Sequence, residues 1–276
     1  MVQATVVLLL LLTVPAVAAA GSSLLRGAYP DFEPPVYRAP SSSCDVTSAP
    51  WSAKGDGRSL DTAALQKCIR ECPRGPDGSF AVVLKAGKSF LTGALNLSSG
   101  CHFIVDGELL GSTDPEDYPV IPPLPGYGPG QRDTALHGWG RHQALLSGWN
   151  MSGVVVAGHG VIDGQGNVSN AHGSSWVSRF KAVHNCLPPP RGHGKGCEDE
   201  PVVSILDFGR PRIWEPMFSR RLSLVNVSVR NQAFWAVHPY GCDDVYIGSV
   251  NISAPRDEGI PNDDGIDPGP SLGGAP

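Results

Sequence analysis

The 276-residue sequence carries little charge: Asp, Glu, Lys and Arg make up 17% of it, whereas 41% of the residues are apolar. This balance excludes a disordered chain and indicates a globular, well-buried one. The basic residues form no tract, and residues 192–196 lack the spacing of a phosphate-binding loop, so we expect neither a nucleic-acid partner nor a cofactor. No apolar run after residue 20 could cross a bilayer. With 34 Gly and 26 Pro the chain must turn often, which favours a β-rich body over long helices.

The first 20 residues have the pattern of a signal peptide. Five leucines occupy positions 8–12, and three alanines at 18–20 precede Gly21, a small-residue site that a signal peptidase accepts. We predict cleavage near Ala20, a linker over 21–43, one domain over 44–276, and a secreted monomer of the extracellular space or cell wall without stable membrane association. No Lys or Arg precedes the apolar run, so a short membrane anchor is the alternative. Five Asn-x-Ser/Thr sequons agree with export, at Asn96, Asn150, Asn167, Asn226 and Asn251.

The seven cysteines of an exported chain predict disulfides, and their odd number leaves one thiol without a partner. Cys186 and Cys197 flank a Pro- and Gly-rich stretch, and we expect a disulfide between them. A zinc site made of His184, Cys186, His193 and Cys197 is the alternative, although its ligand spacing is uneven.

Two segments near the carboxyl end repeat one alternating pattern. Apolar residues at 222, 224, 227 and 229 recur at 245, 247, 250 and 252, an offset of 23 residues. Alternation marks strands with one buried face, and a fixed period of this length marks a solenoid of stacked coils. Earlier strands are predicted at 81–84, 103–105 and 154–156. The fold predicted is therefore all-β, a parallel β-helix.

Residues 59–72 form the one clear predicted helix, with Ser59 or Asp61 available as its N-cap. A solenoid needs a lid over its open core, and this helix would cover the first coil. Residues 119–130 are rich in Pro and Gly and predict a long surface loop, with no sign of a second domain.

The segment Asn262-Asp263-Asp264-Gly265-Ile266-Asp267-Pro268 gathers three carboxylates around a glycine. An ordinary Asp-Gly turn is the alternative. If the 23-residue offset continues, His238 and Tyr240 align with positions 261 and 263 of the next coil. We therefore predict a groove in which an imidazole and a phenol lie one rung below the acids, suited to stacking on sugars and bonding their hydroxyls.

Several short motifs appear in a fixed order along residues 51–268, and any one of them alone is weak. Together they resemble the polygalacturonase-type members of glycoside hydrolase family 28, the right-handed β-helix pectinases, with plant and algal proteins as the best fit. The motifs are Gly-Asp-Gly at 55–57 with Asp-Thr at 61–62, Phe-Leu-Thr-Gly at 90–93, Leu-Gly-Ser-Thr-Asp-Pro at 110–115, Gly-Val-Ile-Asp-Gly-Gln-Gly at 160–166, Phe-Trp-Ala-Val-His-Pro at 234–239, and the acidic segment at 262–268.

The resemblance implies inverting hydrolysis of glycosidic bonds in pectin-type polysaccharide, without a metal or cofactor. By position it assigns the water-activating carboxylate to Asp264, although Asp263 stands where the family has Thr. The substrate-binding residues expected are His238, Tyr240, Asn262 and Asp263. We expect Asp267 to have a structural role, capping the turn or packing on the coil edge.

Three family elements do not follow Asp264: a pair of adjacent aspartates that includes the general acid, a Gly-His-Gly, and the Arg-x-Lys that grips the uronate. Gly-His-Gly at 158–160 and 192–194 precedes Asp264, and both copies are interpreted as turns. The resemblance therefore implies a chain truncated at its carboxyl end and inactive by itself.

Two other functions fit the same residues. One is a non-catalytic β-helix that binds cell-wall polysaccharide through His238, Tyr240 and Asp264. The other is a calcium-assisted pectate lyase, with Arg256 as the base. The net charge of -5 gives no long-range attraction to an acidic polymer, so binding must use local cations. Arg220, Arg221 and Arg256 are candidates, although solvated surface arginines are the commoner case.

Overall fold

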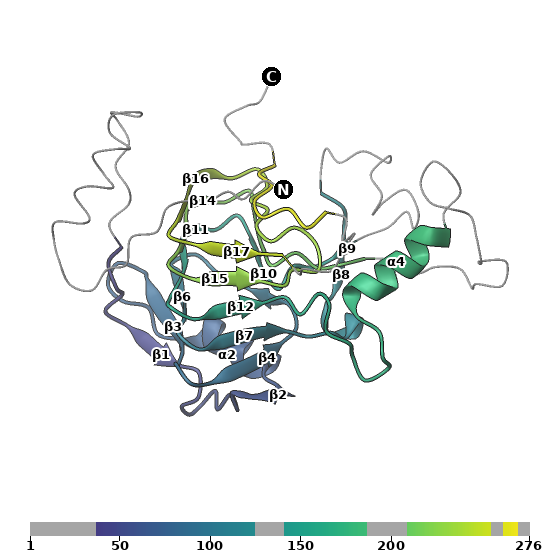
Figure 1. Ribbon diagram of the computed structural model, residues 1–276. Helices are drawn as coiled ribbons and strands as arrows, with labels where there is room; N and C mark the ends of the chain where they lie inside the picture. Colours follow the sequence, from purple (N-terminus) through teal and green to yellow (C-terminus); the bar gives the residue numbers. More distant parts are fainter. Residues whose placement is uncertain (1–36, 125–140, 187–208, 255–261, 270–276) are drawn as a thin grey trace, which may run out of the picture.

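The computed structural model describes residues 37–124, 141–186, 209–254 and 262–269. Their strands wind in successive coils that stack from β1 and β2 at one end to β16 and β17 at the other (Figure 1). Every pairing between the coils is parallel, which confirms the predicted parallel β-helix.

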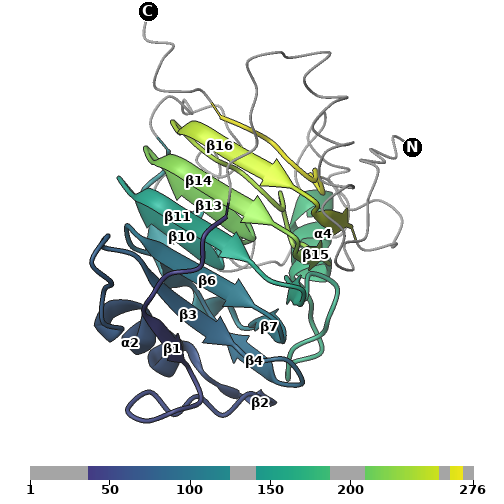
Figure 2. The same ribbon diagram turned by 90° about the vertical axis from the view of Figure 1, so that its left-hand side faces the viewer.

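The coils present three faces. The first, which faces the viewer in Figure 2, pairs in the order β1 (Ser43–Asp45), β3 (Phe80–Leu84), β6 (Cys101–Val105), β11 (Ser152–Ala157), β14 (Arg220–Val225) and β16 (Asp243–Gly248). The second runs β2 (Asp56–Leu60), β4 (Ser89–Thr92), β7 (Glu108–Gly111), β12 (Val161–Asp163), β15 (Ser228–Arg230) and β17 (Asn251–Ser253). The third face pairs β5 (Leu95–Asn96), β10 (Leu146–Trp149) and β13 (Trp214–Met217), and parallel bridges continue it through Val237 to Ile266.

The predicted strands are confirmed at all five places, because their alternating apolar side chains fill the space between the faces. Leu222 and Leu224 of β14 and Val229 of β15 are buried, and Val245 and Ile252 in the next coil are partly buried against them. The same cluster of core residues extends from Cys44 to Cys242. One continuous core therefore supports every coil.

The coils differ in length. Paired residues lie 21 positions apart between Phe80 and Cys101 and 23 apart between Arg220 and Asp243. The offset is 53 between His102 and Val155 and 68 between Ser152 and Arg220. Both long coils carry their extra residues between a strand of the second face and the next strand of the third, at 112–145 and 164–213. The 23-residue period therefore describes only part of the stack.

The two insertions carry secondary structure of their own. The first holds a 3-10 turn at Pro115–Asp117 and the strands β8 (Val120–Ile121) and β9 (Arg141–His142), which pair antiparallel; the predicted 119–130 loop thus includes a short strand, and its residues from 125 on lie outside the described ones. The second holds the helix α4 (Trp176–Cys186), which projects to one side in Figure 1.

The helix α2 (Thr62–Glu71) confirms the predicted lid. It takes the third-face position in the first coil and buries Leu65, Cys68 and Ile69. Gln66 extends the third face below β5: its Oε1 accepts from the amide of Asn96 (2.8 Å) and its Nε2 donates to the Asn96 carbonyl (2.9 Å). The Gln66 side chain thus pairs the backbone amide and carbonyl of Asn96 at the edge of β5 that faces the helix.

Of the two predicted N-cap residues of this helix, Asp61 is confirmed by position and Ser59 is not. Ser59 lies in β2, and Asp61 occupies the N-cap position without a side-chain capping bond. The buried Asp61 carboxylate accepts instead from the amides of Lys54 (2.7 Å) and Gly55 (3.0 Å). The Asp61 carboxylate therefore binds two backbone amides outside the helix and makes no capping hydrogen bond to the first turn of α2.

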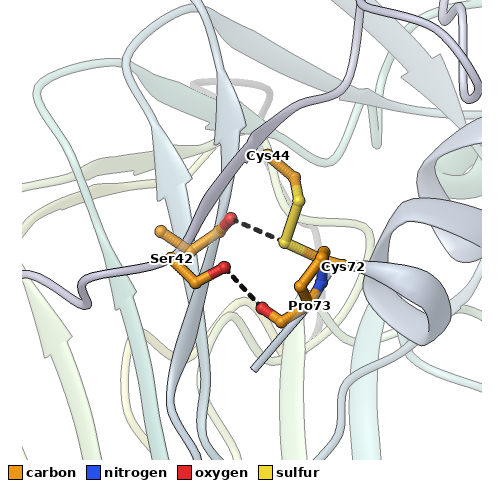
Figure 3. Close-up of a disulfide and its surroundings, with 5 residues drawn as sticks. Ser42, Cys44, Cys72 and Pro73 are labelled. Carbon is orange, nitrogen blue, oxygen red and sulfur yellow. Dashed lines mark hydrogen bonds between the residues drawn. A yellow bond between two sulfur atoms is a disulfide. The ribbon is translucent and has the colours of Figure 1, made fainter. Parts of the chain in front are cut away.

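The described part of the chain holds one disulfide and three free thiols. Cys44 in β1 forms a disulfide with Cys72 just after α2, which ties the first strand to the lid, and Ser42 donates to Pro73 nearby (2.5 Å) (Figure 3). The prediction of a disulfide framework with one spare thiol is wrong, because the buried residues Cys68, Cys101 and Cys242 are all free. The Cys186–Cys197 bond and the alternative zinc site depend on residues outside the described ones.

Candidate functional site

The acidic segment returns to the third face, but in a different register from the predicted one. Val237 bridges Ile266, an offset of 29 residues instead of 23. Asp264 therefore lies one coil above Trp235, and Asp267 lies one coil above His238. The predicted alignment of His238 with position 261 and of Tyr240 with Asp263 is wrong, because the turn between these coils is six residues longer than the one before.

Backbone hydrogen bonds hold the segment Asn262–Asp267, called here the acidic loop. The carbonyl of Asp264 accepts from the amide of Ala236 (2.9 Å), and the amide of Asp267 donates to the carbonyl of Val237 (2.9 Å). The buried Gln232 donates through Nε2 to the carbonyl of Asp263 (2.9 Å). Asp264 is exposed on this edge. The loop is thus fixed along the third face with the Asp264 side chain accessible.

Arg210 joins the acidic loop to the second insertion. It donates to the carbonyl of Ala233 (2.9 Å) and to Oδ1 of Asn262 (3.4 Å). Its guanidinium lies 3.7 Å from the ring centroid of Phe180 in α4 and 4.7 Å from that of Phe234. Asn262, predicted to bind substrate, therefore also contacts a protein arginine.

Glu215 is the centre of a buried ionic cluster beneath this loop. Its carboxylate, with none of its surface exposed, accepts from Nη1 of Arg141 and from Nδ1 of His238 (2.8 Å) and forms an ion pair with Nε of Arg212 (3.1 Å). We call these four residues the Glu215 cluster. Alternation along β13 explains the arrangement: Trp214 points into the apolar core, so Glu215 points to the outer side.

The cluster keeps Glu215 ionised. Burial alone would raise the pKa of this carboxyl, but the positive charge of Arg212, the hydrogen bond from His238 and the charge of Arg141 together lower the pKa to about 2. One buried carboxylate thus faces two guanidinium groups.

Aromatic rings line the third face around His238. Its ring centroid lies 4.8 Å from that of Trp235 and 5.9 Å from that of Tyr240. Nε1 of Trp235 is a buried donor with no hydrogen-bond partner among the described residues. Tyr240 is buried against Met217 and packs edge-on against Phe218. His238 and Tyr240 therefore meet as predicted, but both are covered, and their roles in binding substrate stay predictions.

One large ring at this end of the third face is open to solvent. Trp149 of β10 is 58% exposed, and its ring centroid lies 4.4 Å from that of Phe218. Trp149 pairs with Met217, which bridges Tyr240 on the next coil. An exposed indole is suited to stacking on a sugar face.

The candidate cations from the sequence lie elsewhere. Arg220 and Arg221 belong to β14 on the first face, where both are exposed and Arg221 donates to Ser152 (2.8 Å). Arg256 lies outside the described residues. His159 has an 86% exposed side chain beside Asp106, which agrees with the interpretation of 158–160 as a turn, whereas 192–194 is not described. The alternative of solvated surface arginines was therefore correct for both residues of β14.

The residues that the sequence analysis missed are Arg141, Arg210, Arg212 and Glu215. Two of them carried a usable signal, since the 23-residue offset that fails above His238 holds below it: Trp214 bridges Val237, so Glu215 aligns with His238 and Arg212 with Trp235. Nothing in the sequence indicates that Arg141, 74 residues before Glu215, reaches the same carboxylate.

Within the described ranges, no three His, Cys, Asp or Glu side chains gather as metal ligands do. The arrangement instead combines the exposed carboxylate of Asp264 with buried guanidinium groups and aromatic rings. No helix in the described part has the length and apolar character needed to span a membrane.

Comparison with known proteins identifies relatives of this chain, although no family model matches it. A "Probable polygalacturonase" of Vitis vinifera is 34% identical over 235 residues, which cover 82% of this chain and 40% of that protein. An exopolygalacturonase of Zea mays is 25% identical over 238 residues, covering 85% of this chain and 45% of that one. The chain thus spans less than half the length of these relatives.

Solved structures show the same fold. The exopolygalacturonase of Thermotoga maritima superposes with a TM-score of 0.62 at 21% identity, covering 90% of this chain and 53% of that one. The polygalacturonase of Erwinia carotovora gives 0.59 at 22% identity, covering 86% and 54%. On its sequence relatives and its parallel β-helix, this chain belongs to the polygalacturonase-like proteins.

Proposed function

We propose that this protein is a secreted glycoside hydrolase that cleaves pectin-type polysaccharide with inversion at the anomeric carbon. The observation that carries the proposal is the register of the acidic loop, which puts the exposed Asp264 over Trp235 and the Glu215 cluster. Similarity to named polygalacturonases supports the same reaction.

The chemistry assigns Asp264 to the activation of water. An inverting glycosidase uses two carboxyl groups roughly 6.5–9.5 Å apart, so that a water fits between the base and the sugar. Asp263 and Asp264 are adjacent, and the backbone of Asp267 is bonded to Val237 at the coil edge. None of these neighbours is suited to act as the general acid opposite Asp264. Turnover therefore needs a further carboxyl group, whereas substrate binding does not.

The test is release of reducing ends from polygalacturonate, with direct binding measured beside it. In protein that also contains this further carboxyl group, we expect Asp264→Asn to lower turnover by about 100-fold or more, as loss of a general base does, while binding persists. Asp244→Asn, which alters an exposed aspartate of β16 on the first face, is the matched control and should leave both unchanged.

The alternatives give different results in the same assay. Binding without turnover, unaffected by Asp264→Asn, would identify a non-catalytic polysaccharide-binding protein. An unsaturated product whose formation stops with a chelator would identify a lyase and refute hydrolysis. Replacing polygalacturonate with a neutral polysaccharide separates recognition of the uronate from general binding of sugar chains.

A further inference from the structure

Glu215 connects three successive coils of the stack. Arg141 comes from the return of the first insertion, Arg212 from the return of the second, and His238 from the following coil. Arg141 and His238 donate to one completely buried carboxylate, and Arg212 forms an ion pair with it. Each insertion therefore re-enters the third face through an arginine bound to the same residue.

Two partners of Glu215 lie in the coils below the acidic loop. The guanidinium of Arg212 lies 4.8 Å from the ring centroid of Trp235, which occupies the rung below Asp264. His238 occupies the rung below Asp267 and packs against the same indole, with 4.8 Å between ring centroids. Glu215 thus contacts His238, the neighbour of Asp267, and reaches Trp235, the neighbour of Asp264, through Arg212.

We propose that Glu215 is a positioning residue: it fixes Arg212, and through it Trp235, together with His238, so that an acidic sugar chain binds in one register over Asp264. This role rests on the proposed function. Glu215 itself touches no substrate, because its side chain is enclosed by its three partners.

The consequences of losing this carboxylate can be estimated. Without this carboxylate, the two guanidinium groups lose the negative charge between them and repel one another, and His238 loses a hydrogen bond to a charged acceptor, so Arg212 and His238 should move. Displacement of a binding or reacting group by about 1 Å can cost on the order of 100-fold in catalytic efficiency. A residue that only stabilised the fold would change the unfolding midpoint and leave the affinity of folded molecules unchanged.

The experiment compares Glu215→Gln with a matched control in the full chain. Asp163→Asn removes a carboxylate that accepts from Nε of Arg230 (2.8 Å) on the second face, away from the Glu215 cluster. Calorimetric titration with trigalacturonate, at a temperature where both variants are folded by circular dichroism, measures the dissociation constant. We expect Glu215→Gln to weaken binding roughly 10- to 100-fold and Asp163→Asn to leave it unchanged.

A second measurement tests the hydrogen bond between His238 and Glu215 in the absence of substrate. In wild type, the Nδ1 proton of His238 should give a slowly exchanging NMR resonance, which Glu215→Gln should shift or remove. Unchanged affinity in folded Glu215→Gln, an equal loss in Asp163→Asn, or absence of the resonance in wild type would each overturn the role of Glu215. Failure of the wild-type chain to bind trigalacturonate would instead overturn the proposed function, and this role with it.

Discussion

Replacing Glu215 with Gln should remove a pH-dependent part of the folding stability. In the folded protein burial opposes ionisation of Glu215, but Arg212, His238 and Arg141 together lower its pKa from 4.5 to about 2. Because the folded-state pKa lies below that of the unfolded chain, the ionised group stabilises the fold fully above about pH 4.5. This contribution is lost as the pH falls through 4.5 towards 2.

The difference between the two pKa values corresponds to about 3 kcal/mol of unfolding free energy, since one pH unit is worth about 1.4 kcal/mol. No discount for solvent screening applies, because the side chain is fully buried. At pH 3 the wild-type chain should already have lost about 2 kcal/mol of this contribution. At pH 6 Glu215→Gln should be about 3–5 kcal/mol less stable than wild type, as expected for a buried charge cluster missing one partner.

Urea unfolding of both proteins at pH 6 and pH 3 measures these values. Asp56, whose pKa is lowered to about 2 by hydrogen bonds from Ser59 and Arg58, and Asp45 and Asp77, whose pKa values are also lowered, titrate in both proteins and cancel in the difference. The destabilisation by Glu215→Gln should therefore shrink by about 2 kcal/mol on acidification. A variant that loses stability between pH 6 and pH 3 as steeply as wild type would refute the reasoning.

Two further predictions concern the lid. Replacing Cys44 and Cys72 by Ser opens a loop of 28 residues, which should lower the unfolding free energy measured in urea by about 3–4 kcal/mol. A Cys68→Ser control keeps this disulfide, so adding a reductant to it should cause the same loss. Gln66→Ala removes both hydrogen bonds to the Asn96 backbone and should cost about 1–2 kcal/mol. Hydrogen exchange at the Asn96 amide should become faster, and an unchanged rate would show that Gln66 does not protect this edge.

Much of the fold could be predicted because its signals are local. The alternation at 222–229 and 245–252 requires one buried face whatever the rest of the chain does, and it appears as β14 to β17. The apolar stripe of α2 and its position ahead of the first full coil likewise indicated a lid. The order of short motifs led to the polygalacturonase-like family, which the relatives confirm.

The candidate site was predicted less well, because it depends on register between coils. Extending the 23-residue offset beyond His238 assumed a constant turn length, and the actual offset of 29 shifts every acidic residue by six positions along the coil below. The disulfide prediction was wrong for a related reason: a sequence gives the number of cysteines but not which of them lie close enough to bond.

The sequence by itself determined that this chain is a stack of β-coils with an acidic segment in its last described turn. Only the tertiary structure decided that Glu215 gathers Arg141, Arg212 and His238 beneath that segment. Side-chain alternation is a property of a few consecutive residues, and it survives any change in the turns. Contacts between coils depend on how many residues each turn contains and where the insertions return, and these lengths carry no periodic signal.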